Sequence, residues 1–122
     1  MIKLTYFIHR LPHLSEAEFH DYWRNIHAEL IKKHAPTFDI RRYIQLHATD
    51  DPRNEPNAAF PRRYDGIAEL WFGFRQGLDE WFHNTTPEAI VAGKEIRDDE
   101  RKFADRANSP FLIGEEVSII ED

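Results

Sequence analysis

The sequence predicts an α+β fold whose elements follow the order β-α-β-β-α-β. Segments of alternating polar and apolar residues indicate four strands, and apolar residues at spacings of three and four indicate two main helices. This order is that of a split βαβ, or ferredoxin-like, fold, in which an antiparallel sheet carries the helices on one face. The chain has 122 residues, about the length of one domain, so we expect a single domain over residues 1–122.

Four segments alternate with a period of two, as strands do. They are residues 2–8, 42–48, 64–73 and 112–120. In the second of them we expect Ile44 and Leu46 to share one face and Tyr43 the other. The third ends at Gly73, and Pro110 separates the last from the preceding helix.

The first helix has complete start and stop signals. Ser15 and Glu18 form an S-x-x-E capping box, and Pro36 disfavours helical geometry at the residue before it, so the helix should end near His34. Its apolar stripe is expected to be Phe19, Tyr22, Trp23, Ile26 and Leu30.

A short helix is expected over residues 78–82, and a longer one follows. Thr86 caps the longer helix, with Pro87 at its first position, where proline costs no hydrogen bond. Its packing stripe is expected to be Ala89, Gly93, Ile96, Phe103 and Ala107.

Two surface features follow from this arrangement. The proline-containing loop over residues 49–63 is long for a compact domain, which is typical of a lid, a binding loop or a tolerated insertion. The sheet face without helices would carry Phe7, Tyr43, Ile67 and Trp71. Such a patch is larger than a monomer usually exposes, so we predict a homodimer through the open sheet face.

Composition excludes several classes of function. Sixteen Lys and Arg against 22 Asp and Glu give a net charge of −6, which disfavours nucleic acid and anionic membrane surfaces as partners. No apolar run approaches the ~18 residues of a spanning helix, and residues 1–10 do not resemble a signal peptide. The chain contains no cysteine, which excludes disulfides and thiolate chemistry, and we expect a cytoplasmic protein.

The histidines and serines do not form a known catalytic or metal-binding motif. His20, His27 and His34 are seven residues apart, which on a helix separates neighbours by about 10.5 Å, too far to share one metal ion. There is no G-x-S-x-G elbow and no Gly-rich phosphate loop. We therefore expect no metal site and no bound cofactor; haem, which only the histidines suggest, is a third alternative.

His27 is the most interesting titratable residue. It lies one helical turn beyond Trp23, at the edge of the buried face. A partly buried imidazole there can act as general base or acid, but a histidine bonded to a backbone carbonyl fits the same spacing. His83 and Tyr6 are candidates to complete a proton relay, although the position of His83 is more typical of a surface histidine that closes a short helix.

Several aromatic residues converge between the helices and the sheet. They could bind a small hydrophobic or aromatic metabolite or simply form the core, and the candidates for substrate binding are Trp23, Phe72, Trp81, Phe82 and Phe103.

Two segments resemble the signatures of EthD domains. Residues 19–30 (FHDYWRNIHAEL) match the pattern F-x-x-Y-W-x-x-x-H-A-x-L, and residues 64–72 (YDGIAELWF) resemble the second signature on the central strand. The resemblance runs from about Lys3 to Ile120 and implies a dimeric α/β-barrel in which His27 lines a cavity. Relatives include accessory proteins of an ether-degrading cytochrome P450 system, methylmuconolactone isomerases and dehydratases of aromatic polyketides, none of which needs a tightly bound cofactor.

Two functions are therefore expected from different classes. The first is a small cofactor-free isomerase, cyclase or dehydratase that moves protons on an aromatic, lactone or polyketide-like compound. The second is a non-catalytic protein that binds a hydrophobic metabolite for a partner oxygenase.

Overall fold

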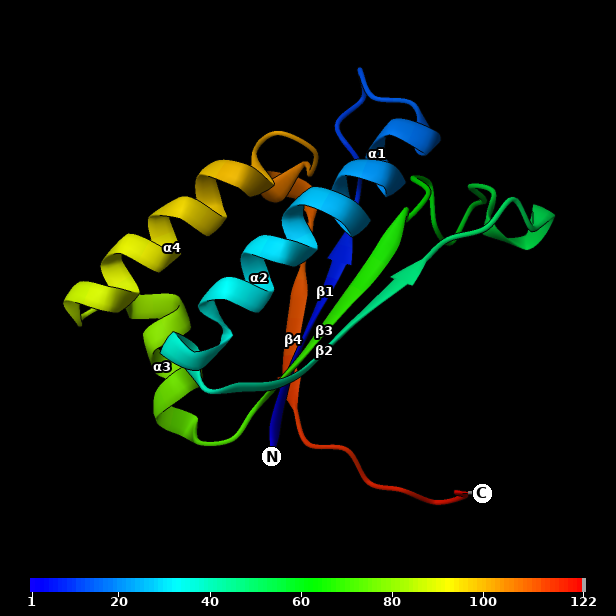
Figure 1. Ribbon diagram of the computed structural model, residues 1–122. Coiled ribbons are helices and arrows are strands. Elements are labelled where there is room, and N and C mark those ends of the chain that lie inside the picture. The colour runs from blue at the N-terminus through cyan, green and yellow to red at the C-terminus, as the bar shows by residue number, and fades with distance from the viewer. Residues whose placement is uncertain (122) are drawn as a thin grey trace.

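A computed structural model describes residues 1–121 and confirms the ferredoxin-like fold (Figure 1). The four strands are β1 (Ile2–Ile8), β2 (Ile40–His47), β3 (Gly66–Phe72) and β4 (Phe111–Gly114). They form one sheet in the order β2-β3-β1-β4, with every neighbouring pair antiparallel. Of the two central strands, β3 is mostly buried, whereas β1 alternates apolar residues with Lys3 and Thr5 and is largely half-buried, because helices cover only one face of the sheet.

The α-helices all lie on one side of this sheet (Figure 1). The first helical segment comprises α1 (Glu16–Tyr22), a π-helical turn (Trp23–His27) and α2 (Ala28–His34), and a 3₁₀ turn (Ala35–Phe38) leads from it into β2. α3 (Arg75–His83) and α4 (Pro87–Glu100) follow β3. The predicted caps are formed: Ser15 and Glu18 make the reciprocal capping box, and the Thr86 side chain accepts from the Ala89 N–H.

Several predicted boundaries were wrong, most clearly those of α3, α4 and β4. α3 is longer than residues 78–82, and α4 ends at Glu100, which leaves Ala107 exposed outside it. β4 ends at Gly114 rather than at Ile120. Gly114 already lies opposite Lys3, close to the start of β1, so the chain beyond it has almost no strand left to pair with.

The faces of β2 are also the reverse of the prediction. Tyr43 lies opposite Leu70 and packs against the buried core, whereas Ile44 and Leu46 lie on the open face. The inward position of Gln45 explains this register, because its amide donates to the Trp23 carbonyl at 2.9 Å and to the Tyr43 hydroxyl at 3.0 Å. The polar residue is therefore satisfied inside, and the aliphatic ones face outward.

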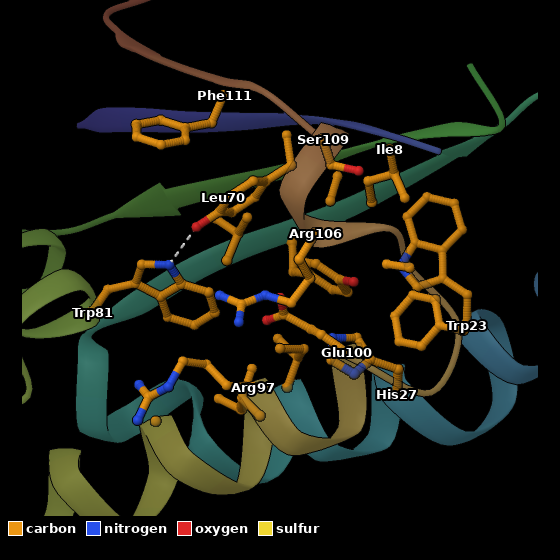
Figure 2. Close-up of a pocket in the computed structure, with 18 of the residues that line it drawn as sticks. Ile8, Trp23, His27, Leu70, Trp81, Arg97, Glu100, Arg106, Ser109 and Phe111 are labelled. Carbon is orange, nitrogen blue, oxygen red and sulfur yellow. Dashed lines mark hydrogen bonds and ion pairs between the residues drawn. The ribbon is translucent and has the colours of Figure 1, made fainter. Parts of the chain in front are cut away.

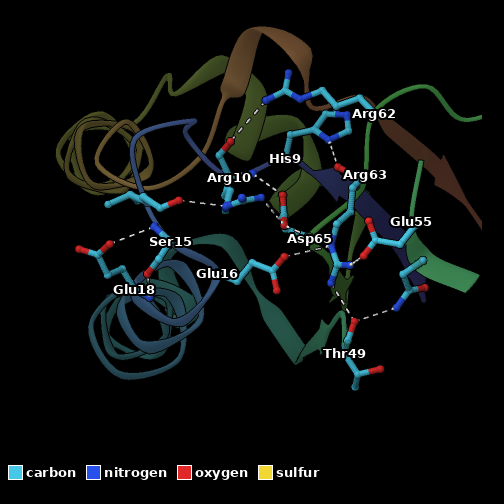
Figure 3. A network of polar contacts seen from close by, with 12 residues as sticks. His9, Arg10, Ser15, Glu16, Glu18, Thr49, Glu55, Arg62, Arg63 and Asp65 are labelled. Atoms are coloured by element: carbon cyan, nitrogen blue, oxygen red, sulfur yellow. Dashed lines mark hydrogen bonds and ion pairs between the residues drawn. The ribbon is translucent and has the colours of Figure 1, made fainter. Parts of the chain in front are cut away.

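A network of ion pairs anchors the loop after β2 (Figure 3). Asp65 is 2% exposed, and it accepts from the Arg10 backbone N–H at 2.9 Å and from the Arg10 guanidinium at 3.1 Å. Arg63 donates to the Thr49 carbonyl at 2.8 Å and pairs with Glu55 at 3.2 Å. These contacts tie residues 49–63 to the end of the sheet. None of the helices in residues 1–121 has the length and apolar character needed to span a bilayer.

Candidate active site

A cavity of about 260 Å³ lies between the helices and the sheet (Figure 2). Its walls are mostly apolar and aromatic, with a few polar groups, which is the usual composition of a small-molecule site. The volume is slightly below the ~300–1,000 Å³ that is typical of drug-sized ligands, so it favours a small metabolite. Its lining includes Tyr6, Trp23, His27, Tyr43, Trp81, Arg97, Glu100, Phe103 and Arg106.

The π-helical turn in the first helical segment determines which side chains reach this cavity. The Ala28 N–H bonds to the Trp23 carbonyl, five residues back, so the turn contains one residue more than an α-helical turn. In a regular helix Ile26 would follow Trp23 on the buried face, but Ile26 is 52% exposed. His27 and Ile31 take the inward positions instead, at 4% and 2% exposed. The inserted residue therefore rotates His27 into the cavity wall.

His27 is held by a carboxylate from the opposite helix. Its Nδ1 lies 2.8 Å from Oδ2 of Asp99, and the hydroxyl of Tyr22 donates to the other oxygen of Asp99. Because a carboxylate only accepts, Nδ1 carries the proton and Nε2 presents a lone pair. Among residues 1–121 no group hydrogen-bonds Nε2, and the protein does not fully bury this atom. The free nitrogen is thus available to a molecule in the cavity.

The environment of His27 keeps its imidazole neutral near pH 7. Burial lowers the pKa of His27 below its ordinary value of 6.5, and the neighbouring Asp99 opposes this without cancelling it. A neutral imidazole with a free Nε2 and an oriented Nδ1–H is the form that accepts a proton. Asp99 would then stabilise the imidazolium.

Two tyrosine hydroxyls also border the cavity. The Trp81 indole N–H donates to the Tyr6 hydroxyl at 2.8 Å, and Gln45 donates to that of Tyr43. Burial raises the pKa of Tyr6 and that of Tyr43 to about 12, so both stay protonated. Each accepts a hydrogen bond from a neighbour and retains its own O–H, which can donate to a carbonyl oxygen.

α4 brings charged groups to the same cavity. Glu100 pairs with Arg106 Nε at 3.1 Å, and burial raises the pKa of the Glu100 carboxyl while Arg106 opposes that shift. Arg97 donates to the side-chain oxygen of Asn84. Sequence reasoning missed Asp99, Glu100, Arg97 and Arg106. A signal was present, because Arg97 and Glu100 interrupt the predicted apolar stripe of this helix at spacings of four and three.

The predicted site residues separate into two groups. Tyr6, Trp23, His27, Trp81, Phe82 and Phe103 line the cavity. Phe72 does not; it is fully buried beneath Trp81, with ring centroids 6.2 Å apart.

His83 is not brought to the cavity. It is the last residue of α3 and lies exposed on the surface, so it is not placed to share a proton with His27. The loop over residues 49–63 contributes no lining residue either, and it does not act as a lid in this structure.

The three histidines of the first helical segment have separate partners. His20 lies 2.7 Å from His47, His27 contacts Asp99, and His34 contacts Glu95 at 2.8 Å. Within residues 1–121, no three His, Cys, Asp or Glu side chains converge in a way that could hold a metal ion.

Comparison with known proteins identifies a family and a fold. The model of a family described as the EthD domain matches residues 11–107. An EthD family protein from Bacillus halodurans C-125 is 22% identical, with a TM-score of 0.61 over 96% of this chain and 99% of its own. HapK from Hahella chejuensis is 13% identical, with a TM-score of 0.61 over 100% and 98%.

A dimeric protein of ferredoxin-like fold from Bacteroides fragilis is also similar. It is 13% identical, with a TM-score of 0.58 over 94% of this chain and 95% of its own. No curated protein sequence matches the chain significantly. At these identities the solved structures establish the fold alone.

Proposed function

The chain belongs to the EthD domain family, and we propose that it is a small cofactor-free enzyme that moves protons on a hydrophobic carbonyl compound. The reaction class is isomerisation, cyclisation or dehydration of an aromatic, lactone or polyketide-like substrate. The observation that carries this proposal is the His27–Asp99 pair: Nε2 of His27 has no hydrogen-bond partner among residues 1–121, and the His27 side chain lines a mostly apolar cavity.

The chemistry begins with a proton on the carbon next to the carbonyl group. His27 Nε2 takes this proton, and the electron pair of the C–H bond moves to the carbonyl oxygen to give an enolate. Asp99 stabilises the imidazolium that forms, as a carboxylate behind a catalytic histidine does. Return of the proton to a different carbon completes an isomerisation, and loss of a β-hydroxyl group as water completes a dehydration.

Tyr43 is the group we assign to the oxygen that becomes negative. Gln45 donates both to its hydroxyl and to the Trp23 carbonyl, which places Tyr43 at the His27 end of the cavity, whereas Tyr6 lies beside Trp81 at the other end. The O–H of Tyr43 is still free to donate after its oxygen accepts from Gln45. A hydrogen-bond donor fixed in a site that excludes water stabilises an oxyanion more strongly than water does, because it needs no reorganisation. The aromatic walls contributed by Trp23, Trp81 and Phe103 would hold the flat part of the substrate.

The proposal can be tested without knowing the natural substrate. 2-Tetralone, a bicyclic ketone with acidic C–H groups next to its carbonyl, is incubated in D₂O, and hydrogen–deuterium exchange is followed by NMR. We expect the wild-type protein to catalyse exchange and His27→Gln to lose at least about a hundredfold in rate, the contribution of one general base. His83→Gln is the matched control and should exchange at the wild-type rate, because His83 lies outside the cavity.

Equal exchange rates for His27→Gln and the wild type would contradict the proposal. Binding of the ketone with no exchange above buffer would favour the second function, a non-catalytic protein that holds a metabolite for a partner oxygenase.

The open sheet face supports a homodimer as the working form. The aliphatic residues Ile44, Leu46 and Leu112 lie exposed there, at 37%, 58% and 65%. Trp71 is only 5% exposed, because Lys3 and Arg42 stack on its ring and its indole N–H donates to Glu116. An apolar sheet face of this kind is best covered by a second copy of itself, and the similar protein from Bacteroides fragilis is dimeric.

A further inference from the structure

The charge of the cavity differs in sign from that of the whole chain. The protein has a net charge of −6, yet the charged side chains that line the cavity are two arginines and one glutamate. Glu100 is mostly buried and already faces Arg106. No carboxylate among residues 1–121 lies within ion-pair distance of Arg97, which donates a hydrogen bond to the neutral side chain of Asn84. The lining of the cavity therefore contains one more guanidinium than carboxylate.

Both guanidinium groups retain donors that no side chain occupies. Glu100 takes only Nε of Arg106, and Asn84 takes only Nη1 of Arg97. A guanidinium carries five N–H donors in a planar fork that matches a carboxylate. Arg97 is half-buried and the Arg106 side chain is 40% exposed, so water reaches their remaining donors. A carboxylate bound in the cavity would replace that water with charge-assisted hydrogen bonds.

The local structure holds Arg97 in this position. Asn84 closes α3 in a left-handed conformation, with φ of 52°, and its side chain lies against Gly93 of α4. A Cβ atom at residue 93 would lie 2.3 Å from the Asn84 oxygen, so only glycine lets Asn84 reach Arg97. Arg97 follows Gly93 by one helical turn and Glu100 follows Arg97 by three residues, which places all three on one side of the helix.

The positive groups and the imidazole lie at different ends of the cavity. Figure 2 shows Arg97 and Trp81 on one side and His27 with Trp23 on the other, with Arg106 between them. A ligand that contacts both ends must therefore carry its charge away from its reacting carbon.

We infer that the substrate of the proposed reaction is an acid: a flat, largely apolar compound with a carboxylate group that binds Arg97 and Arg106. This inference rests on the proposed function for the reaction at His27, but the anion preference itself is a property of the arginines. The carboxylate would bind at the Trp81 end, and the carbon that loses its proton would lie beside Nε2 of His27. The site would thus select acidic compounds over neutral ones of the same shape.

The test compares two probes of equal shape that differ in charge. Binding of 2-naphthoate and of its neutral isostere 2-naphthamide is measured by quenching of tryptophan fluorescence and by calorimetry. Charge-assisted hydrogen bonds are about twice as strong as neutral ones, so we expect the wild type to prefer the carboxylate by about tenfold. This preference should fall with rising salt concentration.

Arg97→Gln should lose most of the preference while it still binds the amide. Gln keeps an N–H for Asn84, and no ion pair is broken. Arg101→Gln is the matched control, because this substitution removes the same charge at an exposed residue. Arg101 directly follows α4 and pairs with Asp98. This variant should keep the wild-type preference.

Further variants separate this inference from the reaction assigned to His27. His27→Gln should also retain the carboxylate preference, even where it abolishes exchange. Equal binding of the two probes by the wild type, or equal loss in Arg97→Gln and Arg101→Gln, would overturn the inference and leave the His27 chemistry standing. If neither probe bound at millimolar concentration, the cavity would not admit an aromatic guest, and the inference would be wrong.

Discussion

Asp99→Asn is the substitution that tests the core of the site most severely. The amide has the shape of the carboxylate but not its charge. In the wild type, Asp99 accepts from His27 Nδ1 at 2.8 Å and from the Tyr22 hydroxyl, and its side chain is only 10% exposed. A hydrogen bond to a charged acceptor contributes ~1.5–3 kcal/mol and a neutral one ~0.5–1.5, so each bond loses about 1 kcal/mol. Lys102, at 3.8 Å and largely exposed, adds little.

The expected loss in free energy of unfolding is therefore about 2 kcal/mol. The bond from His27 loses its charged acceptor, and the amide NH₂, which cannot accept, faces the Tyr22 hydroxyl, so that bond must reverse or break; the lower cost of burying an amide returns a small part. For a chain of this length that corresponds to a melting temperature lower by about 8 °C. Urea denaturation followed by circular dichroism measures the loss. Asp98→Asn is the control: Asp98 pairs with Lys94 and Arg101 on the surface, so its midpoint should stay close to that of the wild type. Equal midpoints for Asp99→Asn and the wild type would refute the hydrogen-bonded triad.

Three further predictions concern stability and assembly. Gly77→Ala should destabilise the fold by about 2 kcal/mol in urea, since its Cβ would lie 2.0 Å from the Phe38 carbonyl oxygen; Gly114→Ala has nothing within 4 Å and should match the wild type. Burial lowers the pKa of His47 from 6.5 to about 4, so between these pH values the unfolded chain binds more protons than the folded one, and stability should fall as pH drops from 6.5 towards 4. His47→Gln should make this decline in melting temperature with pH shallower, and an unchanged slope would contradict the low pKa of His47. Leu46→Glu on the open sheet face should convert the expected dimer to a monomer in sedimentation velocity. A wild-type protein that sediments as a monomer would contradict the predicted dimer.

The sequence was most informative where local physical chemistry determines the structure. The capping box at Ser15 and Glu18, and Thr86 with Pro87, depend on neighbouring residues, and they define where the helices begin. The alternation in the two central strands follows from burial under helices, so the order of elements and the fold could be predicted. Most aromatic residues assigned to the cavity line it for the same reason.

The errors arose where residues far apart in the chain decide the outcome. Nothing in residues 23–27 indicates the π-helical turn, yet that turn exposes Ile26, which was expected on the buried stripe, while His27 stays on the inner side as expected. Asp99 is 72 residues from His27, and no spacing rule relates the two. The faces of β2 were reversed because Gln45 finds its partners on the first helical segment and on Tyr43, which a reading of alternation alone does not reveal.

The protonation state of His27 is the most direct test of the central claim. Long-range ¹H–¹⁵N correlation spectra at pH 7.5 distinguish the two ring nitrogens. We expect Nδ1 to carry the proton and Nε2 to be unprotonated, with a titration midpoint below 6.5, since burial outweighs Asp99 in setting the pKa of His27. Addition of 2-tetralone should shift the Nε2 resonance. A proton on Nε2, or a charged ring at pH 7.5, would contradict the assignment of His27 as the base.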